Sequence, residues 1–222
     1  NIEFSDDRFR VLQLNSLKEI VLKEESELGL NINDVKYIKK NKKEAVNIFS
    51  EKFSELPFNE EYSISNACLL LNTSQTFLNV FPVDFNEEKN SVDSHILWEL
   101  SNYFPDTYKD YIVKYYKLNN NFLSENTDEV LLIAVDKNRI DVMKTLCNGC
   151  VVKIVNIDID QFAVERCIKE SYDGKFSDKN ILLIGCKESR FDFSLISNGK
   201  LRYYDFLISG KENFKSLIDK QL

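Results

Sequence analysis

The feature of this sequence that most restricts its fold is a nearly unbroken apolar run, EVLLIAV, at residues 129–135. A strand with so little polar alternation is typical of a position covered on both faces, in a parallel or mixed sheet. A helical pattern follows at residues 138–146, then a second strand at 151–157 and a second helix at 160–170. This alternation of strands and helices predicts an α/β fold.

Hairpin signals near both ends of the chain indicate mixed sheets rather than a purely parallel one. Residues 2–14 are expected to form two strands around a polar turn, and the sequence SNGK at 197–200 is typical of a hairpin turn between strands at 191–196 and 201–208. The same patterns predict further strands at 20–28, 35–38, 67–71, 76–81, 111–118 and 181–184, and helices at 43–56, 90–104 and 212–222.

The charge balance limits the classes of partner. The formal net charge is −7, which excludes a generalised nucleic-acid surface. The one basic run, KYIKKNKK at residues 36–43, is either a local basic patch or a solvated turn or helix start. No apolar run approaches the ~18–20 residues of a membrane helix, so we expect no membrane insertion. Five cysteines at irregular spacing do not predict a disulfide framework and favour a reducing, cytoplasmic setting.

Three features of the sequence are candidates for a chemical role: a C-x-x-C motif, a single histidine and a pair of aspartates. The C-x-x-C of Cys147 and Cys150 closes a helix, where a redox motif should open one, and His95 is the only histidine available to complete a zinc site. Gly149 stands where a helix cap is expected. Asp158 and Asp160 follow a strand, so they either cap the next helix or line a ligand site. No nucleophile and base are paired in a known pattern, so we expect no catalytic residue and no metal ligand.

Several stretches resemble the PilM family of type IV pilus assembly proteins. Residues 90–118 contain SHILWELSNYFP and then DYIVKYYKL. They are similar to a family helix with a Trp-Glu pair that precedes a strand in a small inserted subdomain. The preceding LLLNTSQTFLNVFPV looks like that subdomain's first hairpin. Residues 129–167 are similar to a family strand–helix–strand–helix stretch, with matches at Gly149, Asp158, Phe162 and Ala163. The segment ILLIGCKESRFDFSLISNGK looks like the second phosphate loop with its hairpin, where Gly199 holds the turn.

This resemblance spans most of the chain and implies an actin-like, ribonuclease H-like fold, related to FtsA and to the cytoplasmic domain of GspL. It implies mixed sheets with a small inserted α/β subdomain and an incomplete second lobe. The expected division is residues 1–65 for the first part of lobe 1, 66–118 for the inserted subdomain, 119–177 for the rest of lobe 1 and 178–222 for the start of lobe 2. We expect a chain truncated relative to the family, or a reduced relative.

Departures from the family pattern fall on the two phosphate loops, which in the family are hairpins with an acid, a glycine and small hydroxyl residues. In the first loop Ile2 occupies the position of the family's acidic residue and Phe4 the position of its glycine. Only Ser5 remains there as a candidate contact to a phosphate. Two aspartates follow and would repel phosphate. In the second loop Gly185 is kept and the acid is lost. Lys187, Ser189 and Arg190 are the candidate anion contacts there, unless they form an ordinary exposed hairpin tip.

Family members are cytoplasmic, bind ATP and hold the short cytoplasmic tail of the inner-membrane protein PilN. The resemblance therefore implies a cytoplasmic adaptor, peripheral to the inner membrane through a protein partner, that docks a peptide of a pilus or secretion machine. The degraded loops predict that it needs no cofactor and is not catalytic. The alternative is an ATP- and Mg²⁺-binding actin-like ATPase with divergent loops.

Overall fold

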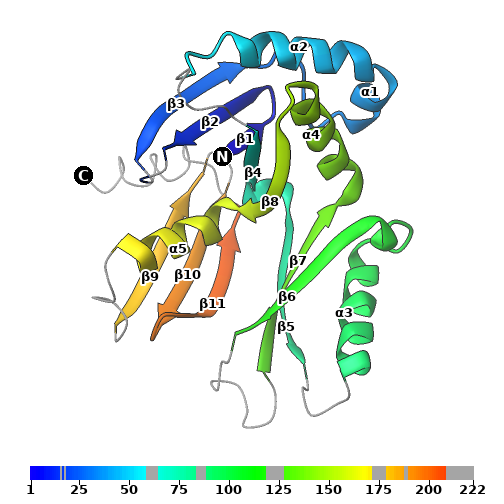
Figure 1. Ribbon diagram of the computed structural model, residues 1–222. Helices are drawn as coiled ribbons and strands as arrows, with labels where there is room; N and C mark the ends of the chain where they lie inside the picture. The colour runs from blue at the N-terminus through cyan, green and yellow to red at the C-terminus, as the bar shows by residue number, and fades with distance from the viewer. Residues whose placement is uncertain are drawn as a thin grey trace, which may run out of the picture. The chain divides into compact units, whose positions relative to one another are not determined.

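The elements of the chain form three sheets in the computed structural model, which describes residues 1–15, 17, 19–58, 65–83, 89–118, 128–171, 179–187 and 190–208. The chain divides into two compact units (Figure 1). The first is Asn1–Thr76 with Val135–Asp160, and the second is Phe77–Ala134 with Gln161–Leu222. The α/β prediction is confirmed. The predicted helix at 212–222 lies outside the described residues, and the expected four-part division stays a prediction.

A five-stranded mixed sheet forms the centre of the first unit, with the order β3-β2-β1-β4-β8. Its strands are β1 (Ile2–Ser5), β2 (Arg8–Leu14), β3 (Ile20–Glu27), β4 (Asn66–Leu71) and β8 (Lys153–Ile159). The strands β1, β2 and β3 pair antiparallel, whereas β4 runs parallel to both β1 and β8. The predicted hairpin at residues 2–14 is thereby confirmed, and β2 alternates buried and exposed side chains as a strand with one covered face should.

Three α-helices lie in the described part of this unit: α1 (Val35–Lys40), α2 (Lys42–Ser54) and α4 (Lys137–Gly149). The predicted strand at 35–38 is wrong, because these residues open α1. The carboxylate of Asp34 accepts the backbone N–H of Tyr37 at 2.9 Å and so caps this helix. On α2 the phenyl ring of Phe49 packs against those of Phe4 and Phe9 in the core, with ring centroids 5.4 and 5.0 Å away.

Gly149 has a different role from the predicted helix cap. It is the last residue of α4, and the residue with positive φ beyond the helix is Val151, at 59°. A Cβ built on Gly149 would lie 2.4 Å from Cγ1 of Val46 on α2, far inside van der Waals contact. The glycine therefore lets α2 and α4 approach closely, which is a packing requirement rather than a turn requirement.

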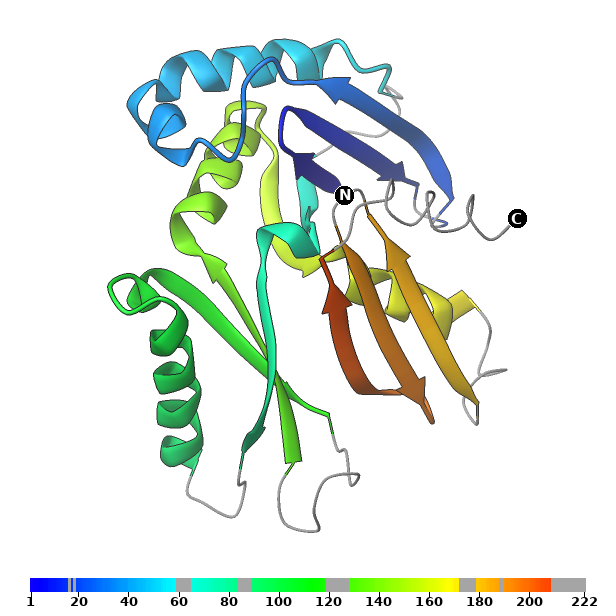
Figure 2. The same ribbon diagram turned by 180° about the vertical axis from the view of Figure 1, so that it is seen from behind.

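In the second unit, one sheet has the order β5-β7-β6, made of β5 (Phe77–Val83), β6 (Tyr111–Lys117) and β7 (Asp128–Asp136). Helix α3 (Lys89–Tyr103) lies along one face of it, and the short helix η2 (Tyr108–Asp110) precedes β6 (Figure 2). The shared core contains Phe81, Ile96, Leu100 and Leu132. The apolar run at 129–135 is a strand with both faces buried, as predicted.

The expected hairpin of residues 67–71 and 76–81 is wrong, because its two strands join different sheets. Strand β4 pairs with β1 and β8, whereas β5 pairs with β7. Between them lies the 3₁₀ helix η1 (Thr73–Gln75), opened by a capping box of Asn72 and Gln75. The η1 segment therefore connects strands of two different sheets.

The remaining three strands form an antiparallel sheet of order β11-β10-β9: β9 (Asn180–Cys186), β10 (Phe191–Ser197) and β11 (Lys200–Leu207). Asn198 and Gly199 have φ values of 52° and 67°, which confirms the predicted tight hairpin turn. Helix α5 (Asp160–Ser171) contacts this sheet through Phe162, whose ring centroid lies 5.8 Å from that of Tyr204. The hairpin pairing of β9 with β10 also follows the expectation.

Candidate functional site

Polar groups gather in the first unit at the carboxyl ends of β1, β4 and β8, which run parallel. In open α/β sheets this edge is the usual place for a ligand. Here the amide of Gln75 donates to the backbone carbonyl of Phe4 at 3.0 Å, and the backbone N–H of Thr73 donates to Oδ1 of Asp160 at 3.2 Å. These bonds connect the ends of all three strands through the η1 segment.

The two aspartates predicted as caps or ligands lie in different elements. Asp158 is part of β8, and its carboxylate accepts the backbone N–H of Ile159 at 2.8 Å. Asp160 begins α5, where a carboxylate is favourable near the positive end of the helix dipole. Its carboxylate also accepts the backbone N–H of Thr73. A further helix cap, not predicted from the sequence, is Asp136, whose carboxylate accepts the N–H of Asn138 at 2.8 Å at the start of α4.

The β1–β2 turn is closed by the segment that follows β3. The carbonyl of Asp7 accepts the N–H of Leu28, and the carbonyl of Asp6 accepts the N–H of Ile32, each at 2.6 Å. The Asp6 carboxylate also accepts Nδ2 of Asn33 at 2.5 Å. Next to it, Ser5 is half-buried at the end of β1. The turn thus presents two carboxylates on a backbone already engaged within the unit, an arrangement that repels an anion.

Gly185 lies inside β9, paired with Asp192 of β10, rather than in the predicted turn. A Cβ on Gly185 would meet Oε1 of Gln161 at 2.3 Å. The Gln161 side chain is buried there and donates from Nε2 to the hydroxyl of Ser194 at 3.1 Å. The absence of a side chain at Gly185 therefore makes room for a buried amide from α5.

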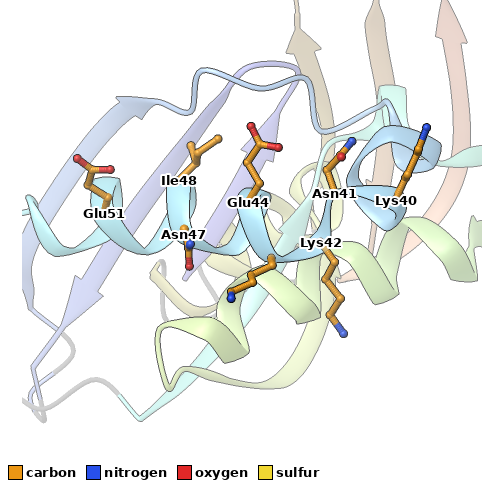
Figure 3. Close-up of a pocket in the computed structure, with 8 residues that line it drawn as sticks. Lys40, Asn41, Lys42, Glu44, Asn47, Ile48 and Glu51 are labelled. Atoms are coloured by element: carbon orange, nitrogen blue, oxygen red, sulfur yellow. The ribbon is translucent and has the colours of Figure 1, made fainter.

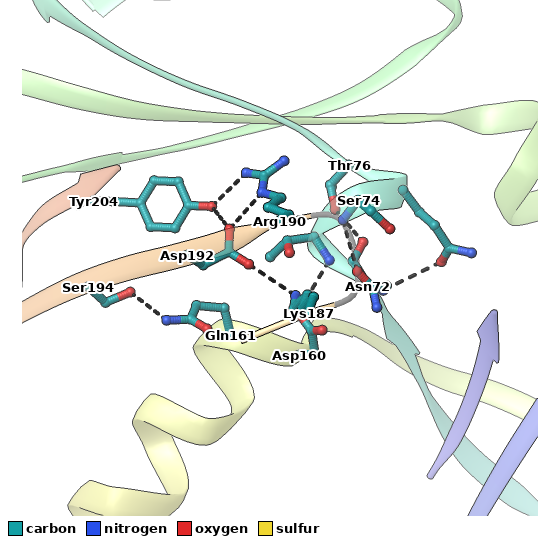
Figure 4. Close-up of polar contacts among 12 residues, drawn as sticks. Asn72, Ser74, Thr76, Asp160, Gln161, Lys187, Arg190, Asp192, Ser194 and Tyr204 are labelled. Atoms are coloured by element: carbon teal, nitrogen blue, oxygen red, sulfur yellow. Dashed lines mark hydrogen bonds and ion pairs between the residues drawn. The ribbon is translucent and has the colours of Figure 1, made fainter. Parts of the chain in front are cut away.

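A buried ionic cluster, defined as Lys187, Arg190, Asp192 and Tyr204, lies at the turn end of the β9–β10 hairpin (Figure 4). Asp192 is fully buried, and its carboxylate meets Nε of Arg190 at 2.7 Å and Nζ of Lys187 at 3.2 Å. The Tyr204 hydroxyl donates to the same carboxylate at 2.6 Å and accepts from Arg190 at 2.8 Å. The guanidinium also stacks on the ring of Phe206, 3.8 Å from its centroid.

Two of the predicted anion contacts, Lys187 and Arg190, belong to this ionic cluster. A hydrogen bond of 2.9 Å from the backbone N–H of Lys187 to the carbonyl of Arg190 closes the β9–β10 turn. Both basic side chains point into the ionic cluster (Figure 4), and Arg190 is buried. Burial raises the pKa of the Tyr204 phenol, and the hydrogen bond to Asp192 raises it further. The phenol therefore stays protonated and is a fixed donor rather than an acid–base catalyst.

Of the predicted site residues, the structure brings together Gly185, Lys187 and Arg190 on one hairpin. Ser5 belongs to the other unit, and Ser189 lies outside the described residues. Asp192 was missed, although a signal was present. Residues two apart on a strand share a face, so an aspartate between apolar neighbours, two residues after an arginine, indicates an internal ion pair.

A protein-family model, described as type IV pilus assembly protein PilM, matches residues 2–219. The chain belongs to the PilM family. A search by sequence among proteins of curated function finds no significant match. Within solved structures, the chain is similar to a PilM–PilN type IV pilus biogenesis complex, at 12% identity and a TM-score of 0.67, with 100% of this chain and 64% of that chain covered.

The cytoplasmic domain of EpsL, an inner-membrane component of the Vibrio cholerae type II secretion system, is similar at 9% identity and a TM-score of 0.55. There the match covers 98% of this chain and 72% of that one. At these identities the two likenesses establish the fold, which is the actin-like fold that the resemblance implied. This PilM-family chain spans less than two thirds of the PilM chain in the complex. Within the described residues, no helix is long and apolar enough to cross a membrane.

Proposed function

We propose that this PilM-family chain is a non-catalytic adaptor that docks a peptide of a membrane-associated assembly, such as a pilus or secretion machine, and uses no ATP. The observation that carries the proposal is the commitment of Lys187 and Arg190 to the buried carboxylate of Asp192. A phosphate group would have to compete with that carboxylate for both cations. Buried charge pairs of this kind are costly to separate.

The β1–β2 turn supports the same conclusion from the first unit. Asp6 and Asp7 place two negative charges where the family places a phosphate loop, and their carbonyls already accept from Leu28 and Ile32. Phe4, at the position of the family glycine, is fully buried against Phe49 and cannot be exchanged for a small residue without loss of core packing. An anion brought to this turn would meet repulsion rather than donors.

The proposed partner is the cytoplasmic tail of an inner-membrane protein of PilN type. It is supported by family membership and by the structural likeness to a PilM chain in a PilM–PilN complex. In this proposal the chain contributes a rigid surface and the peptide binds as an extended segment, so that backbone hydrogen bonds provide affinity and side-chain pockets provide selectivity.

Titration calorimetry with a synthetic peptide of the partner's cytoplasmic tail tests the docking. Saturable heat at micromolar peptide is expected, and no heat at several hundred micromolar would contradict the proposal. Equilibrium binding of a fluorescent ATP analogue, with and without Mg²⁺, tests the absence of nucleotide. Tight Mg²⁺-dependent binding that is lost in Lys187→Gln but kept in Lys200→Gln, an exposed lysine of the same sheet, would contradict this part of the proposal and favour the ATP-binding alternative.

A further inference from the structure

The basic run of the sequence folds into one corner of the first unit, where α1 ends and α2 begins. Lys36, Lys39 and Lys40 lie on α1, and Lys42 and Lys43 lie in the first turn of α2. All five side chains are exposed. We call these five residues the lysine corner. Within a chain of net charge −7, it is a local concentration of positive charge.

Few of these lysines have a partner within the described part of the chain. Lys39 donates to Oδ1 of Asn138, but none of the other four corner lysines forms an ion pair or hydrogen bond with the described part of the chain. Lys42 and Lys43 stand at the positive end of the α2 dipole, where a cation is unfavourable. Asn41 provides no side-chain cap there. These charges cost stability in the isolated chain, and an external anion would offset that cost.

The neighbouring acidic groups do not neutralise the lysine corner. Asp34 is used as the cap of α1, and Glu44 and Glu51 point to the side of α2 opposite to Lys42 (Figure 3). An open hollow of about 530 Å³ along α2 is lined by both of these glutamates together with Lys40, Lys42 and Lys43. A discrete polyanion seated in the hollow would therefore meet carboxylates as well as lysines.

We propose that the lysine corner binds the surface of an anionic phospholipid bilayer. Lysines spread around a protruding helix junction suit a diffuse sheet of negative charge, which needs no fixed geometry at any one phosphate. Tyr37, about half exposed at 45%, lies among these lysines and is a residue type that partitions to the membrane–water interface. The acidic remainder of the chain is repelled by the same surface, so contact through this corner also orients the protein.

Sedimentation with phospholipid vesicles tests this proposal. The chain is expected to bind vesicles of 70% phosphatidylcholine and 30% phosphatidylglycerol at 50 mM NaCl, to dissociate at 500 mM NaCl, and to ignore pure phosphatidylcholine. Replacement of Lys36, Lys40, Lys42 and Lys43 by glutamine should reduce partitioning by about 600-fold, since each of the four lysines near such a surface contributes about a fivefold factor. Glutamine keeps the helix propensity of lysine, and circular dichroism checks that the variant is folded.

The matched control removes four exposed lysines elsewhere: Lys23, Lys114, Lys153 and Lys200. It changes the net charge equally and should bind like the parent or more weakly by less than about fivefold. Equal losses in both variants, or no binding of the parent, would overturn the proposal. Tighter corner-dependent binding to a short DNA duplex than to the vesicles would overturn the choice of lipid. The vesicle assay contains no peptide or nucleotide, so its outcome is independent of the adaptor role.

Discussion

The carboxylate of Asp192 is the group whose removal tests the ionic cluster most directly. Asp192→Asn keeps the shape of the side chain and removes its charge, while Arg190 stays buried with its Nε 2.7 Å from the substituted group. Breaking one side of a buried charge pair costs about 3–5 kcal/mol, because the remaining charge is left uncompensated. Lys187 retains some access to water, with its side chain 17% exposed, so we expect the lower end of this range.

Hydrogen–deuterium exchange of the β9–β11 peptides measures this loss locally, without assuming that the two units unfold together. A loss of about 3 kcal/mol should accelerate exchange there roughly 100-fold. Asp205→Asn, on the exposed face of β11, is the matched control and should change exchange less than about threefold. Adding Arg190→Met to Asp192→Asn should recover part of the loss, since no buried charge remains unpaired. Equal effects of Asp192→Asn and Asp205→Asn would refute the reasoning.

Three further predictions concern close packing and a buried thiol. Gly185→Ala should destabilise the second unit by about 1 kcal/mol by displacing the Gln161 amide, and should cost nothing further in a Gln161→Ala background, as a double-mutant cycle by urea unfolding will show. Gly149→Ala should cost about 1–3 kcal/mol through its clash with Val46, and Val46→Ala should relieve most of that penalty in thermal unfolding. Burial raises the pKa of the Cys147 thiol to about 12, so iodoacetamide at pH 8 should label the exposed cysteines and spare Cys147 until the chain unfolds. Rapid labelling of Cys147 in the folded chain would contradict its burial. The folded state holds this thiol protonated, whereas the unfolded chain ionises it in the ordinary thiol range. The free energy of unfolding should therefore fall as the pH rises through that range.

Local patterns predicted most elements correctly, because hydrophobic spacing and turn residues act within a few positions. The apolar run at 129–135, the hairpin turn at Asn198 and Gly199, and the helices at 43–56 and 90–104 all depend on such short-range signals. The strand predicted at 35–38 failed because apolar residues in so short a segment fit either periodicity. The Asp34 cap then decided for a helix.

The partners of each strand were not predictable in the same way. Nothing local distinguishes a hairpin of β4 and β5 from two strands in separate sheets, because the choice depends on β1, β8 and β7, which are far away in sequence. The candidate site has the same limitation. Its cations were identified from the resemblance to the family's second phosphate loop. The carboxylate that engages them was not identified, since the pairing requires the strand register and the burial of Asp192.

By itself the sequence determined the α/β class, the positions of most strands and helices, the presence of Phe4 where the resemblance places a loop glycine, and the concentration of lysines at residues 36–43. Only the tertiary structure decided what those residues meet. In the folded chain Phe4 lies in the core, and the lack of a side chain at Gly185 leaves room for the side chain of Gln161. Lys187 and Arg190 form ion pairs with Asp192. The physical reason is that the charge and hydrophobicity of a side chain are fixed by its residue type, whereas its burial and its partners depend on which residues surround it in the folded chain.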